Sequence, residues 1–133
     1  MTKDIWHEAP AAPLSGKSDI KVRITRYASG ICAVQVMFKS SALEEHLGGD
    51  IAGKRVGVRY CHASGKRLVA IALDGDTHEA GKGNRGGASI SFGVLDGMVR
   101  EPVPAASMRI VDVEPGQRIV LELPAALYGE ESP

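Results

Sequence analysis

The chain has 133 residues, of which 44% are hydrophobic and 24% charged, and its 16 basic side chains are balanced by 16 acidic ones. This length and composition predict one globular domain, since single domains most often contain about 100–150 residues. Only 5% of the residues are aromatic, which argues against a surface that binds bases by stacking. The sequence contains neither the long apolar run of a membrane helix nor the apolar segment of a secretion signal, so we expect a cytoplasmic protein that binds no membrane.

Charge is distributed unevenly along the chain. Residues 21–70 hold nine basic and three acidic side chains, a net charge of +6, whereas residues 71–133 hold five basic and ten acidic ones, a net charge of −5. Such a division is typical of a face that attracts polyanions, or of two faces that attract each other in a homodimer. Solvated strand faces would give the same pattern by chance.

The first half of the chain predicts two hairpins with a short helix between them. Residues 1–19 lack hydrophobic periodicity and predict a flexible N-terminal arm. From residue 20 apolar and polar residues alternate with period two, which predicts a strand with one buried face. A turn at Ser29-Gly30 then leads back into an apolar strand over 31–38.

After this hairpin, Ser40 or Ser41 offers an N-cap, and Ser41 with Glu44 would form a capping box for a helix over 42–47 that ends at Gly48-Gly49. Alternating residues predict a second hairpin, with strands over 54–61 and 67–73. This part of the chain is therefore expected to be β-rich around one short helix.

The second half begins after a glycine-rich segment, residues 74–87, which we interpret as a linker. A strand over 88–95 ends at Asp96-Gly97, and Pro104 suits the first turn of a helix over 105–111. A final strand is expected over 118–123, before a frayed tail over 125–133. Residues 20–124 then form one domain of two repeats, 20–73 and 88–123, because both halves follow the same order of expected elements.

Four features of the first half occur in one order: the strand at Val22–Thr25, the Ser29-Gly30 turn, the helix over 42–47 and the stretch Gly53–Val56. In this order the first half resembles the AbrB-like swapped-hairpin family of transcription factors, and residues 96–123 look like a second copy of the unit. The resemblance implies a mainly β fold with one or two short helices, arranged as a pseudo-two-fold AbrB-like or double-psi β-barrel. It also implies that the first hairpin faces DNA.

The basic residues of the first repeat are the candidate nucleic-acid site, since Lys and Arg that neutralise phosphates supply most of the affinity for DNA. The candidates are Arg23, Arg26, Lys39, Lys54, Arg55, Arg59, Lys66 and Arg67. Of these, we expect Arg23, Arg26 and Arg55 to carry the affinity together. The glycine-rich segment 81–87 could also cradle an anion with its backbone N–H groups, although a connector is the simpler interpretation.

The sequence carries no metal-ligand spacing and no nucleophile motif, so it predicts no catalytic residue, no metal, no cofactor and no enzymatic activity. It predicts a DNA-binding transcriptional regulator that binds double-stranded DNA through the first repeat. The alternative is a protein-interaction module, such as an inhibitor or a phage-type accessory factor, that docks through its acidic second half.

Overall fold

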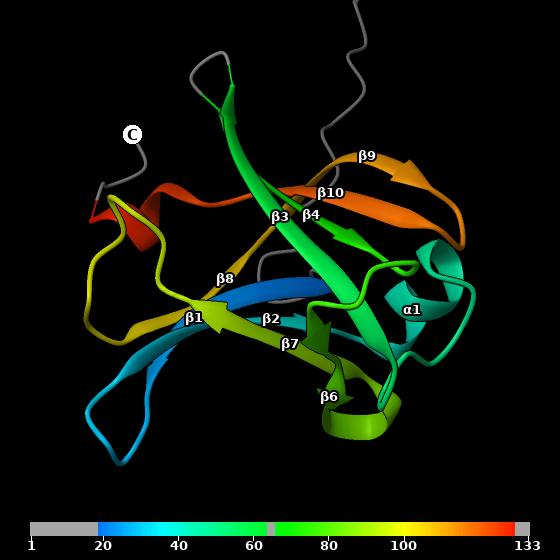
Figure 1. The fold of residues 1–133 in the computed structure, drawn as a ribbon, viewed down its shortest axis with the longest axis horizontal. Coiled ribbons are helices and arrows are strands. Elements are labelled where there is room, and N and C mark those ends of the chain that lie inside the picture. The colour runs from blue at the N-terminus through cyan, green and yellow to red at the C-terminus, as the bar shows by residue number, and fades with distance from the viewer. Residues whose placement is uncertain (1–18, 64–65, 130–133) are drawn as a thin grey trace, which may run out of the picture.

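A computed structural model of the protein describes residues 19–63 and 66–129. These residues form a mainly β structure of two antiparallel sheets with one α-helix at one end (Figure 1). The strands are β1 (Ile20–Arg26), β2 (Cys32–Phe38), β3 (Arg55–Ala63), β4 (Lys66–Ala72), β5 (His78–Glu79), β6 (Gly81–Lys82), β7 (Ala88–Gly93), β8 (Val103–Ser107), β9 (Arg109–Glu114) and β10 (Arg118–Glu122). The helical elements are α1 (Ser40–His46) and the 3-10 helices η1 (Asn84–Gly86) and η2 (Ala125–Tyr128).

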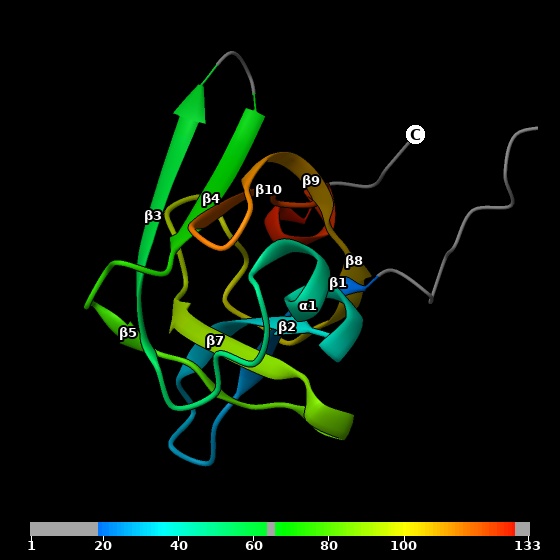
Figure 2. The same ribbon diagram turned by 90° about the vertical axis from the view of Figure 1, so that its right-hand side faces the viewer.

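Each sheet has five strands. The first sheet has the order β6-β7-β2-β1-β8, and the second has the order β5-β3-β4-β10-β9. Strands β8 and β9 are separated by Met108 alone, so the chain passes directly from the edge of the first sheet to the edge of the second (Figures 1 and 2). The two sheets are thus joined along this side, with their inner faces toward each other.

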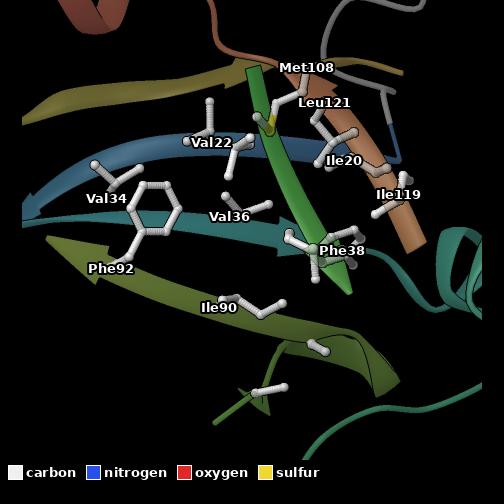
Figure 3. Packing of buried hydrophobic residues seen from close by; sticks show 14 of the residues in the cluster. Ile20, Val22, Val34, Val36, Phe38, Ile90, Phe92, Met108, Ile119 and Leu121 are labelled. Atoms are coloured by element: carbon white, nitrogen blue, oxygen red, sulfur yellow. The ribbon is translucent and has the colours of Figure 1, made fainter. Parts of the chain in front are cut away.

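The core lies between the inner faces of the two sheets. In the first sheet Val22 lies opposite Val36, and in the second Ile71 lies opposite Ile119. All four side chains are completely buried. Aliphatic chains from both sheets interdigitate there with Phe38 and Phe92 (Figure 3). Each such side chain contributes about 1.5–3 kcal/mol through burial, which makes this layer the main source of stability.

The period-two patterns of the first half are confirmed. Strands β1 and β2 form a hairpin in continuous register from Ile20↔Phe38 to Arg26↔Cys32. Strands β3 and β4 form the second hairpin. The expected strands over 88–95 and 118–123 are present as β7 and β10. Alternation predicts strands well because it is set by the direction of each side chain, which is a local property.

Helix α1 is present, but its N-terminus differs from the expectation. The N-cap is Lys39, no side chain caps the helix, and Ser41 lies inside it, so the expected capping box is not formed. The Lys39 N–H donates to the Asp19 carbonyl at 2.8 Å beyond the end of β2, and the helix begins at the next residue, Ser40. Burial of Ala42 and Leu43 anchors the helix instead.

The helix expected over 105–111 is wrong, because these residues belong to β8 and β9. Pro104 lies in β8, which is the edge strand of the first sheet and pairs only with β1 among the described strands. An edge strand tolerates a proline because one side of its backbone needs no ladder partner. Pairing of β8 with β1 and of β9 with β10 overrides the local preference for a helix start at Pro104.

The two halves also differ in strand pairing. Strand β1 pairs with the following strand β2, whereas β7 pairs with β2 and β6, and β8 pairs with β1. The described part of the second half contains no α-helix. The two halves therefore do not show the same order of elements. Each of the two sheets contains strands from both halves of the chain.

The sequence predicts three irregular segments, namely the N-terminal arm, the linker over 74–87 and the tail over 125–133. The arm lies outside the described residues except for Asp19. Segment 74–87 contains β5, β6 and η1 and buries Ala80. Residues 125–128 of the expected tail form η2, which buries Leu127 completely, and residues 130–133 lie outside the described part of the chain. No helix in the described residues has the length and apolar character needed to cross a membrane.

Candidate nucleic-acid interface

The outer face of the first sheet carries basic and small polar side chains. In the ladder, Lys21 lies opposite Met37 and Arg23 lies opposite Gln35. Strand β7 continues these two rows with serines. Because alternate residues of β1 and β2 fill the core, Lys21 and Arg23 lie on the side of the sheet that faces away from it.

A depression of about 360 Å³ lies on this outer face. Four basic side chains line it: Lys21 and Arg23 from β1, Lys39 at the end of β2, and Lys82 from β6. Asp19 is the only acidic residue among the described residues that line it. We call this surface, formed by the depression and its four basic residues, the basic face. Its surplus of positive charge attracts anions.

The rim of the depression is built by the glycine-rich segment that was expected to be a linker. The Gly83 N–H donates to the Gly87 carbonyl at 2.9 Å, and the Gly87 N–H donates to the Asn84 carbonyl at 3.0 Å. A Cβ on Gly87 would clash with the Phe38 carbonyl oxygen, so glycine is needed for this close approach to β2. Close packing against the end of β2 thus places Lys82 and Asn84 at the rim.

Arg85 in the same segment has φ of 53°, the only left-handed backbone conformation of a non-glycine residue in the described chain. This conformation costs roughly 1–2 kcal/mol for an ordinary L-residue. Such strained residues gather at ligand-binding sites, where the surrounding structure holds them in place. Arg85 is exposed and lies three residues beyond Lys82.

A side-chain hydrogen bond orients Arg23 on the basic face. Its Nε donates to Gln35 Oε1 at 2.7 Å across the β1–β2 ladder. This bond uses one of the five N–H donors of the guanidinium group. An arginine held by a neighbour loses less side-chain entropy when it binds a phosphate, so the pair favours anion binding.

The basic residues predicted from sequence are divided between several surfaces. The structure brings Arg23 and Lys39 together on the basic face, and Arg26 ends β1 at the tip of the same hairpin. The other five predicted residues, which lie in or beside the β3–β4 hairpin of the second sheet, are Lys54, Arg55, Arg59, Lys66 and Arg67.

On the second sheet several arginines have local partners. Arg55 forms an ion pair with Asp76. The Arg118 guanidinium lies 3.0 Å from the Glu114 carboxylate and 3.6 Å from that of Asp112. Arg67 stacks 3.8 Å from the ring centroid of Tyr128. The ion pairs of Arg55 and Arg118 reduce the positive charge that the second sheet presents to a ligand.

Lys21 and Lys82 are the residues that the predicted set lacked. Alternation with Arg23 could have placed Lys21 on the outer face. Nothing local signals the position of Lys82, since it depends on the pairing of β6 with β7.

The described residues contain no group of three or more side chains suited to hold a metal ion. No family model, curated protein or solved structure matches the chain.

Proposed function

We propose that the protein binds double-stranded DNA through the basic face and acts as a small regulator of transcription. The observation that carries this proposal is the convergence of Lys21, Arg23, Lys39 and Lys82 on one depression, where Asp19 supplies the only carboxylate among the described lining residues. These four side chains come from three different strands or strand ends, so their cluster is a property of the fold.

The chemistry of the basic face favours phosphates over unstacked bases. Phe38 is the only aromatic residue among the described residues that line the depression, and its side chain is buried in the core. Single strands are bound mainly by stacking on exposed aromatic rings. A duplex instead presents regularly spaced phosphates, which lysine and arginine neutralise with release of counterions. The basic face is therefore suited to the backbone of a duplex.

The resemblance of the first half to AbrB-like regulators favours the same function and the same hairpin. Family membership, the pseudo-two-fold or double-psi barrel arrangement, and the absence of enzymatic activity stay predictions. The proposed regulator needs no metal or cofactor for binding, because the basic side chains themselves supply the charge.

The experiment compares two triple variants in fluorescence anisotropy with a random-sequence duplex over a range of salt concentrations. Replacing Arg23, Lys39 and Lys82 with Gln should weaken binding and make the slope of log K against log salt less steep by about 2–3. The control replaces Lys54, Arg59 and Lys66, which are exposed beside or on the second sheet, and carries the same change of charge. Equal losses in both variants, or no binding by the wild type at low salt, would contradict the proposal.

A second candidate function is docking of a protein partner through the acidic second half. Strand β9 favours it, because β9 is an edge strand on which Ile110 and Val111 are 38% and 41% exposed, next to the carboxylates of Asp112 and Glu114. Exposed edge strands pair readily with other chains. Under this alternative, Val111→Lys abolishes capture of a basic partner, or self-association. The wild-type protein then does not bind DNA either.

A further inference from the structure

The tip of the β1–β2 hairpin exposes two large apolar side chains. Tyr27 is 49% exposed and Ile31 is 65% exposed, and they flank the turn over residues 28–30. In both ribbon views this turn projects from the body of the protein, away from the second sheet (Figures 1 and 2). A projecting tip cannot bury these side chains against its own domain, so they are available to a ligand.

The tip has a defined backbone. The Tyr27 N–H donates to the Ile31 carbonyl at 2.9 Å, and the Gly30 N–H donates to the Tyr27 carbonyl at 2.9 Å. Gly30 has φ of 87°, which a glycine adopts without strain and which closes a three-residue hairpin loop. Tyr27 and Ile31 are therefore held opposite each other at the end of a rigid ladder.

The apolar pair lies on the same side of the hairpin as the basic face. The β1–β2 register continues from Arg26↔Cys32 to Tyr27 and Ile31, and alternation places Tyr27 on the side of Lys21 and Arg23. Tyr27 lies six residue steps along the strand from Lys21, a distance of about 20 Å. One surface thus carries cations at one end and a compact apolar wedge at the other.

We propose that Tyr27 and Ile31 form a wedge that enters the minor groove and inserts between base pairs, so that the protein bends the duplex it binds. This inference rests on the proposed function. The positive charge of the basic face indicates that the ligand of the tip is a DNA duplex, because a duplex whose phosphates are held on the basic face runs along the same surface as the tip. Apolar side chains inserted from the minor groove partly unstack a base step and kink DNA by about 20–90° toward the major groove.

The test measures bending and binding separately on one duplex of about 30 base pairs with a fluorophore at each end. Wild-type protein should raise energy transfer between the ends as it binds. Tyr27→Ala/Ile31→Ala should bind about tenfold or more weakly, with an unchanged salt slope because no cation is removed, and should leave energy transfer at the value of free DNA. Ile110→Ala/Val111→Ala on β9 removes a comparable exposed apolar pair and should leave both measurements unchanged.

Each outcome is decisive. Binding without a change in energy transfer, or a bend that persists in the tip variant, overturns the wedge and leaves the proposed function intact. Absence of wild-type binding overturns both. If the tip variant instead converts a wild-type oligomer to a monomer in analytical ultracentrifugation, the occupant of the tip is a second copy of the chain and the wedge is rejected. Tyr27→Ser/Ile31→Ser, measured beside the alanine variant with thermal melting as a check on folding, should give the same straight duplex.

Discussion

Gly57 in β3 and Gly75 in the turn after β4 lie backbone against backbone. A Cβ added to Gly75 would clash with the Cα and N atoms of Gly57, and one added to Gly57 would lie 3.1 Å from the Gly75 Cα. The Thr77 N–H donates to the Val56 carbonyl at 3.0 Å and holds the segment in place. This contact lays residues 74–79 across the start of β3, where β5 then pairs with Arg55 and Val56.

Gly75→Ala should lower the free energy of unfolding by about 1–3 kcal/mol, since the atoms in the way are backbone and can move only with the strand. Urea denaturation followed by circular dichroism gives this difference from the shift in midpoint. Gly93→Ala is the matched control, because a Cβ there meets nothing within 4 Å. Similar losses in the two variants would show that the close approach of Gly57 and Gly75 is unimportant.

Ile71 and Ile119 lie directly opposite each other in the second sheet and are completely buried. Ile119→Ala should cost about 2–5 kcal/mol of stability, and Ile119→Val about 0.5–1.5 kcal/mol, because each deletion leaves a cavity in proportion to the atoms removed. Ile110→Ala on the neighbouring strand β9 removes the same side chain from a position that is 38% exposed, and should cost far less. Thermal or urea unfolding of the three variants checks this order.

The stacking of Arg67 on Tyr128 predicts a measurable coupling between the β4 strand and helix η2. A double-mutant cycle with Arg67→Ala and Tyr128→Leu should give a coupling energy of about 0.5–1 kcal/mol at this partly exposed site. DNA affinity should not change in Arg67→Ala, since this arginine lies on the second sheet. A strong loss of DNA binding in that variant would return Arg67 to the nucleic-acid site.

Because Gln35 accepts a hydrogen bond from Arg23, the orientation of this arginine can be tested separately from its charge. Gln35→Ala should weaken DNA binding while the salt slope stays unchanged, because the cation remains but is no longer held. Arg23→Ala should weaken binding by about 1–3 kcal/mol and reduce the steepness of the slope by about 0.9. Salt titrations of the two variants distinguish these effects, and an altered slope in Gln35→Ala would contradict the orienting role.

Much of the fold could be predicted from local patterns. Alternation identifies β1, β2, β3, β4, β7 and β10, and the glycine at position 30 identifies the turn of the first hairpin. The failure at β8 and β9 has a physical cause. The stretch after Pro104 resembles a helix start locally, whereas its actual conformation is decided by the pairing of β8 with β1, far away in the chain, and of β9 with the next strand, β10.

The basic site illustrates the same limit. Alternation places Lys21 and Arg23 on one face of one strand, and the uneven charge of the two halves directs attention to the first half. Only the tertiary structure shows that Lys82, which lies in the acidic half, joins Lys39 at the depression. It also shows that Arg55 and Arg67, which lie on the second sheet, contact Asp76 and Tyr128. The alternation of side chains along one strand is a local property, so the sequence determines which residues share a face. Which strands lie side by side depends on how the whole chain buries its apolar surface.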